Sequence, residues 1–156
     1  GGSEEAFVNM MNRRAQELMA NGTHFMNPHG LHDDNHYTTA YDLYLIFNEC
    51  IKHEDFVNII QSEAYTAYYT DVDGNSQEAL FTPTNLYAQG EVDVPENVTI
   101  VGGKTGTTDE AGYCLILMEK DSSDNPYISI VMGASEKPVL YEDMTSLIEA
   151  IPSGQQ

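Results

Sequence analysis

Basic residues are scarce in this chain: six Lys and Arg stand against 25 Asp and Glu, and the formal net charge at pH 7 is −19. Such a surface repels the phosphates of nucleic acids and of anionic lipids, because it has few cations to replace their counterions. The composition therefore excludes nucleic acids and anionic membranes as main partners. Solubility is the simplest explanation of the acidic surface.

Long apolar runs are also missing. No stretch approaches the roughly 20 apolar residues that a membrane-spanning helix needs. The start of the chain lacks the basic segment followed by an apolar stretch that is typical of a secretory signal. We expect any export signal or membrane anchor to lie outside this sequence.

Cysteine is limited to Cys50, in a helical pattern, and Cys114, in a strand pattern. Two thiols are too few for a disulfide framework or a zinc site. We expect both cysteines to be reduced and to lie in the core.

A recognisable nucleophile is absent as well. No serine lies in a Gly-x-Ser-x-Gly sequence, and no serine precedes a lysine by three residues. Catalysis by a nucleophile needs an activated Ser or Cys together with a base and an oxyanion hole. Cys114 is a weak candidate, because a thiol inside an apolar strand is usually inert.

The sequence is nevertheless sufficient for one globular domain, with 156 residues of which 41% are hydrophobic. Ser3 predicts the start of a helix that ends at Asn21-Gly22. Thr39 and Asp42 resemble a capping box at the start of a second helix, whose apolar stripe is Leu43, Ile46, Phe47, Cys50 and Ile51. A shorter helix begins near Glu54 and Asp55, with three residues expected to be buried: Phe56, Ile59 and Ile60.

The later part of the chain has strand patterns. Residues 65–70 alternate like a half-buried strand that turns at Asp73-Gly74-Asn75, and residues 81–97 are expected to be irregular. Three further strands are predicted at 98–101, 112–119 and 127–133. A last helix is predicted at 141–151, with one apolar face made of Met144, Leu147, Ile148 and Ile151. The sequence therefore predicts an α+β fold in which helices precede a three-stranded antiparallel meander that the C-terminal helix covers.

The loop at 23–38 is rich in histidine and aspartate, which are ligands that suit zinc. The histidines lack the i, i+4 spacing that places two ligands on one helix face. We therefore expect no metal and no cofactor here. Local hydrogen bonds to the backbone are the favoured role of these side chains.

Lys104 stands out because it is an isolated cation in the sequence VTIVGGKTGTTDEAGYC. Gly103 and Gly106 on either side let a ligand approach the backbone. Thr105 adds a hydroxyl that can donate to a carboxylate. Local composition leaves two interpretations open, an anion-binding site and an exposed lysine in a turn.

Several segments in order resemble the serine D-alanyl-D-alanine carboxypeptidases, the low-molecular-mass penicillin-binding proteins of the penicillin-binding protein 5 type. Lys-Thr-Gly is the third motif of such enzymes. The segments that carry the resemblance are SEEAFVNMMNRRAQELMANGTHFMNPHGL, HYTTAYDL, TNLY, GGKTGTTDEAGYCLI and ISIVMGA.

The resemblance implies roles for four residues. Lys104 would supply positive potential, and Thr105 would bind the terminal carboxylate of the substrate. Gly106 would leave room for the substrate to lie along the strand, and the Thr107 amide would be one of two oxyanion donors. The resemblance also implies that His29 and its loop support the rim of the active site without a catalytic role.

The resemblance also shows what is missing. The family's Ser-x-x-Lys and Ser-x-Asn motifs precede the helix that starts near Ser3, and neither is present there. Ser123-Asp124-Asn125 spells Ser-x-Asn but follows Lys-Thr-Gly, so we interpret it as a solvated loop. We expect exposed apolar faces, which an N-terminal piece, a second copy or strand exchange would cover.

The chain is thus expected to be the C-terminal portion of a β-lactamase/transpeptidase-like domain. Residues 1–156 would form a single partial penicillin-binding domain, with a helical portion at 3–64 and the sheet and terminal helix at 98–151. The implied function is removal of the terminal D-alanine from peptidoglycan stem peptides in the bacterial cell envelope, with β-lactams as inhibitors. The alternative is a non-catalytic peptidoglycan-binding or interaction domain on the same fold.

Overall fold

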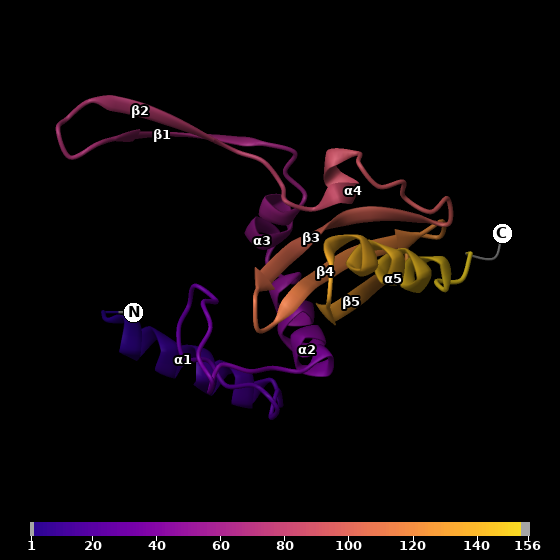
Figure 1. Ribbon diagram of the computed structural model, residues 1–156, viewed down its shortest axis with the longest axis horizontal. Coiled ribbons are helices and arrows are strands. Elements are labelled where there is room, and N and C mark those ends of the chain that lie inside the picture. Colours follow the sequence, from indigo (N-terminus) through magenta and orange to yellow (C-terminus); the bar gives the residue numbers. More distant parts are fainter. Residues whose placement is uncertain (1, 154–156) are drawn as a thin grey trace.

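The computed structural model describes residues 2–153. Its elements follow in the order α1 (Glu4–Glu17), α2 (Ala40–Cys50), α3 (Glu54–Ile60), β1 (Tyr65–Thr70), β2 (Ser76–Phe81), α4 (Leu86–Gln89), β3 (Val98–Thr108), β4 (Gly112–Asp121), β5 (Pro126–Ala134) and α5 (Lys137–Glu149). Figure 1 shows α5 against the three-stranded sheet and the β1–β2 hairpin extending away from it. Within the described range, no helix has the length and apolarity of a membrane span.

The three-stranded sheet is an antiparallel meander with the order β3-β4-β5, as the sequence predicts. β3 is longer than the predicted strand at 98–101, because it continues through the two glycines to Thr108. A register shift between Ile100 and Gly102 accommodates this continuation. β3 and β5 are the outer strands of this sheet, so part of the backbone of β3 is not paired with β4.

The core lies between the sheet and α5. Leu115 and Leu117 of β4 pack with Met144 and Ile148 of α5. The predicted apolar face of the helix is wrong at Leu147, which is 45% exposed. The buried face follows the i, i+4 spacing of Leu140, Met144 and Ile148 instead.

One carboxyl group lies in this core. Glu119 is fully buried on the face of β4 that carries Leu117, and within residues 2–153 neither of its carboxylate oxygens has a hydrogen-bond partner. Burial raises the pKa of Glu119 to about 7. The core therefore contains a group whose charge depends on pH near neutrality.

The opposite face of the sheet meets α2 and α3. Gly102 of β3 is paired with Met118, so its side-chain position faces away from Leu117 and α5. A Cβ atom at Gly102 would overlap the backbone carbonyl of Ile60 at the end of α3. This glycine therefore permits the close approach of α3 to β3.

Substituting alanine for Gly102 should destabilise the fold by about 1 to 3 kcal/mol, because α3 must move away from β3. Urea unfolding followed by circular dichroism measures the change. Gly106→Ala is the matched control, since a Cβ at that position of the same strand has no atom within 4 Å. Equal stability of the two variants would show that the α3–β3 contact is not tight.

The two larger N-terminal helices begin as predicted. Ser3 accepts a hydrogen bond from the Ala6 amide at the start of α1, and Thr39 accepts one from the Asp42 amide at the start of α2. The Asp42 side chain does not return to Thr39 as in a capping box, because it accepts a hydrogen bond from the Thr23 hydroxyl at 2.7 Å. α1 ends at Glu17, before the predicted Asn21-Gly22 stop, and Met19 already has a positive φ of 64°.

Several apolar side chains of the helices lack cover from the described residues. Phe7 and Met10 of α1 are exposed, and Ile59 of α3 is 72% exposed. The predicted burial of Phe56, Ile59 and Ile60 is wrong, because α3 contains no fully buried residue. These surfaces are of the kind that another protein segment covers.

The chain between α3 and β3 also departs from the prediction. Residues 65–70 form β1 as expected, but most of its residues are exposed, because β2 is its one partner strand among residues 2–153. The segment predicted to be irregular contains the short helix α4. Asn85 caps its first turn by accepting a hydrogen bond from the Tyr87 amide, and Gly90 ends it with a φ of 72°.

Candidate active site

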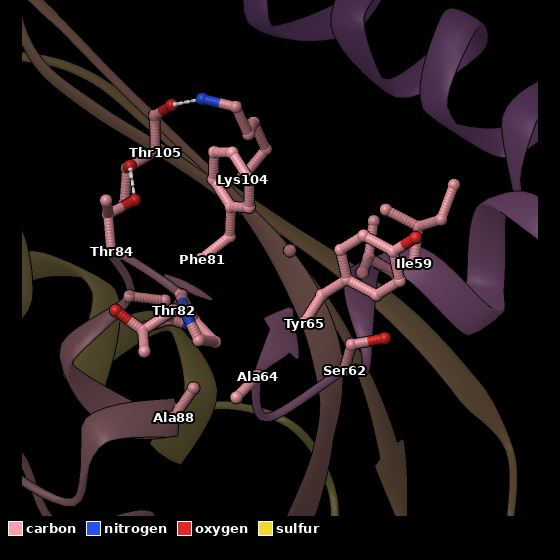
Figure 2. Close-up of a pocket in the computed structure, with 14 residues that line it drawn as sticks. Ile59, Ser62, Ala64, Tyr65, Phe81, Thr82, Thr84, Ala88, Lys104 and Thr105 are labelled. Carbon is pink, nitrogen blue, oxygen red and sulfur yellow. Dashed lines mark hydrogen bonds between the residues drawn. The ribbon is translucent and has the colours of Figure 1, made fainter. Parts of the chain in front are cut away.

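A pocket of about 740 Å³ lies beside the outer edge of β3, between the end of α3, the base of the β1–β2 hairpin and the start of α4 (Figure 2). Its lining is mainly apolar, with Lys104 and Thr105 contributed by β3. The lining residues are Ile59, Ile60, Ser62, Ala64, Tyr65, Phe81, Thr82, Pro83, Thr84, Asn85, Ala88, Gly103, Lys104 and Thr105.

Lys104 lies within β3, so the interpretation as a lysine in a turn is wrong. It is paired with Ile116, which places its side chain on the face of the sheet that α3 approaches. Its ammonium group donates to the backbone carbonyl of Thr105 (Figure 2), and no carboxylate of the described chain forms an ion pair with it. The charge of Lys104 is therefore available to an anionic ligand.

The Thr105 side chain is held in place by a second threonine. Figure 2 shows the hydrogen bond that joins the hydroxyl groups of Thr105 and Thr84. Because a hydroxyl group can donate and accept, this bond leaves Thr105 able to contact a carboxylate as well. The sequence pattern assigned Thr84 no role, although Thr84 is the first residue of the TNLY segment that carries the resemblance.

Gly106 and Thr107 continue along the same strand outside the pocket lining. Both are exposed, and the space that a side chain would occupy at Gly106 is open. An extended peptide can therefore lie along the outer edge of β3 next to these residues. The structure thus places Lys104 and Thr105 in the pocket and Gly106 and Thr107 on the strand beyond it.

The histidine-rich loop at 23–38 is organised by local hydrogen bonds. The Asn27 side chain donates to the Leu31 carbonyl and accepts from the Gly30 amide, while Asp33 accepts from the Asn35 amide. Among the described residues, no group of three or more His, Cys, Asp or Glu side chains has the geometry of a metal site. Hydrogen bonding to the backbone is the observed role of these polar side chains.

The Ser-x-Asn sequence at 123–125 and the two cysteines lie outside the pocket lining. Ser123 and Asn125 are exposed in the turn between β4 and β5, where their amides donate to the Asp121 carboxylate, which confirms the interpretation of this segment as a loop. The two cysteines are free thiols in the described chain, and both are half-buried where full burial was expected. Burial raises the pKa of the Cys50 thiol, so a smaller fraction of it is present as the reactive thiolate at a given pH.

Comparisons with known proteins agree with this architecture. The family model described as D-alanyl-D-alanine carboxypeptidase, Peptidase_S11, matches residues 1–136. The D-alanyl-D-alanine carboxypeptidase DacF of Bacillus subtilis is 32% identical over 95% of this chain and 35% of its own length. DacA of Escherichia coli K12 is also 32% identical, over 85% of this chain and 29% of its own length.

The crystal structure of the Streptomyces K15 DD-transpeptidase is similar, with a TM-score of 0.82 and 26% sequence identity over 96% of this chain and 56% of that chain. The fold is α+β and corresponds to the C-terminal part of that architecture, as predicted. The chain spans about a third of the length of the curated relatives that it matches. On the family match and these similarities, the chain belongs to the D-alanyl-D-alanine carboxypeptidase family.

Proposed function

We propose that this chain is part of a serine-type D,D-carboxypeptidase that removes the terminal D-alanine of peptidoglycan stem peptides. The observation that carries this proposal is the charge of Lys104, which forms no ion pair with residues 2–153, beside the Thr105 hydroxyl in a pocket at the outer edge of β3. A cation, a hydroxyl donor and an unpaired strand edge together suit a peptide that ends in a carboxylate.

In the proposed reaction, a serine oxygen attacks the carbonyl carbon of the penultimate D-alanine. The peptide bond breaks, the terminal D-alanine leaves with a proton, and water then hydrolyses the acyl-enzyme to regenerate the serine. Lys104 and Thr105 hold the terminal carboxylate, and Gly106 leaves room for the peptide. The Thr107 amide donates to the oxyanion together with the amide of the serine.

The serine itself is proposed to come from a protein segment outside this sequence. The uncovered apolar residues Phe7, Met10 and Ile59 support such a segment, because burial against it would remove them from water. Residues 1–156 would then be one part of a single penicillin-binding domain, acting on the wall in the bacterial cell envelope. Pairing of two copies or strand exchange would cover the same surfaces without supplying a serine.

Labelling with a fluorescent penicillin tests this function, because β-lactams acylate the same serine as the substrate. We expect no covalent label on the 156-residue chain and stable label on a longer protein that includes a Ser-x-x-Lys segment. Mass spectrometry of the labelled protein should locate the adduct in that segment.

Two outcomes would contradict the proposal. Stable labelling of the 156-residue chain would show that its own residues supply the nucleophile. Absence of label on the longer protein would favour the alternative, a peptidoglycan-binding or interaction domain without catalysis.

A further inference from the structure

The β1–β2 hairpin is the element of this chain that extends furthest from the sheet and helices (Figure 1). Its two strands pair in an uninterrupted antiparallel register from Tyr65 opposite Phe81 to Thr70 opposite Ser76. Large side chains are nevertheless exposed on it: Tyr65, Tyr68, Tyr69, Leu80 and Phe81. Exposed aromatic residues concentrated on one projecting element indicate a binding surface.

The register separates these side chains into two faces. Residues paired across the hairpin lie on the same face, and the face alternates along each strand. We call one of them the pocket face, and it consists of Tyr65, Ala67, Tyr69, Gln77, Ala79 and Phe81. The opposite face carries Tyr68 and Leu80.

The pocket face continues directly from the candidate active site. Tyr65 and Phe81, at the base of the hairpin, also line the pocket that contains Lys104 and Thr105 (Figure 2). Tyr69 lies four residues along β1, which is about 13 Å at the rise of an antiparallel strand. The small side chains of Ala67 and Ala79 separate the two aromatic positions. A ligand that passes from the pocket along this face would therefore meet a ring, a shallow depression and a second ring.

The charge of this region restricts the class of ligand. No Lys, Arg or His occurs from residue 54 to residue 103, whereas Asp71, Asp73 and Glu78 lie on or near the hairpin. Phosphate polymers and anionic headgroups are therefore disfavoured. An uncharged ligand with apolar ring faces and many hydroxyl and amide groups matches the tyrosine rings and the Gln77 amide of the pocket face, because tyrosine combines an apolar face with a polar end. Amino-sugar chains have this chemistry.

We propose that the pocket face of the β1–β2 hairpin binds a glycan strand of the cell wall beside the stem peptide that enters the pocket. The identification of this glycan as peptidoglycan rests on the proposed function. Tyr65 and Phe81 stack against the sugar nearest to the pocket, and Tyr69 stacks against a sugar further along the chain. The hairpin thereby directs the enzyme to peptides that are still attached to the wall.

The test uses the 156-residue chain and a soluble tetramer of N-acetylglucosamine as the probe. Binding is followed by two-dimensional NMR, which also shows that each variant is folded. We expect saturable shifts at the hairpin and a loss of affinity of about tenfold in Tyr69→Ala, the size expected for one aromatic contact. Tyr68→Ala is the matched control, because it removes an exposed tyrosine from the opposite face of the same strand. Its affinity should stay within about twofold of the parent chain.

Three outcomes would overturn the proposal: no binding of the tetramer by the parent chain, equal losses in the two variants, or concentration-dependent dimers in ultracentrifugation that Tyr69→Ala abolishes. Equal losses would indicate an unspecific apolar surface, and such dimers would show that a second copy occupies the face. Sugar binding needs no serine, so its outcome is independent of penicillin labelling and distinguishes this proposal from the proposed catalytic function.

Discussion

Replacing Lys104 by alanine should slow penicillin acylation by about 100-fold or more in a longer protein that includes the proposed serine. Lys104 forms no ion pair within the described chain, and under the proposed function its charge attracts the carboxylate of the substrate or of a penicillin. Loss of one preorganised polar contact at a hydrolase active site costs about 100- to 1,000-fold in rate. The second-order rate constant for acylation, measured by stopped-flow or timed gel fluorescence, gives the effect.

Lys52→Ala is the control for net charge. Lys52 is exposed and its ammonium lies 2.7 Å from the Glu49 carboxylate, so its removal changes the total charge equally at a site remote in sequence from β3. The acylation rate of the Lys52→Ala protein should remain within about twofold of the parent rate, because the loss of an exposed ion pair has little effect on the stability of the fold. A Lys104→Ala protein that reacts as fast as Lys52→Ala would refute the assigned role of Lys104.

Replacing Glu119 by glutamine should stabilise the protein by about 3 kcal/mol at pH 8 and much less at pH 4.5. The pKa of this carboxyl is raised by burial from 4.5 to about 7. A difference of one pKa unit corresponds to about 1.4 kcal/mol, so the ionised form destabilises the folded state by roughly 3 kcal/mol. Urea unfolding of the parent chain and of Glu119→Gln at pH 8 and pH 4.5 measures the difference in stability between them.

Glu119 ionises at a lower pH in the unfolded chain than in the folded chain, and this order decides how stability changes with pH. Below pH 4.5 the carboxyl is protonated in the folded and the unfolded chain, so ionisation has no effect on stability there. Between pH 4.5 and 7 the unfolded chain loses its proton first, so stability falls as the pH rises, and it levels off above the folded pKa. Burial is the main cause of the raised pKa of Tyr87 in α4, and the nearby Glu119 charge raises it further.

Glu149→Gln removes the same charge from an exposed position of α5 and serves as the control. The 25 acidic residues make the whole protein sensitive to pH, so only the difference between the two variants isolates the buried group. If the free energy of unfolding of Glu149→Gln and of Glu119→Gln depends on pH in the same way, the Glu119 carboxyl is not desolvated in solution.

Local patterns in the sequence were sufficient for the sheet and for the larger helices. The meander was predictable because each strand pairs with the next strand along the chain, so its limits are marked by local turns. The exposure of Ile59 was not predictable, because the helical pattern shows an apolar side chain but not whether anything covers it. The helix α4 was missed since a single turn capped by Asn85 is too short to show a period.

The candidate site was partly predictable for the same reason. Lys104 and Thr105 are adjacent in sequence, and the glycines beside them mark a strand that a ligand can approach. Thr84 and Phe81 reach the same pocket from segments about 20 residues away, and no local pattern marks a contact across that separation. Glu119 resembled a polar residue at the end of a strand until its burial between the sheet and α5 was known.

The consecutive order of β3, β4, β5 and α5 also has a consequence for how the chain folds. Each of these elements contacts its neighbour in sequence, so closing them requires only short loops. Assemblies of such local contacts form faster than sheets built from distant segments. We therefore expect the segment from Val98 to Glu149 to fold first. The α3 helix and the β1–β2 hairpin would then pack against an already formed β3 and complete the pocket.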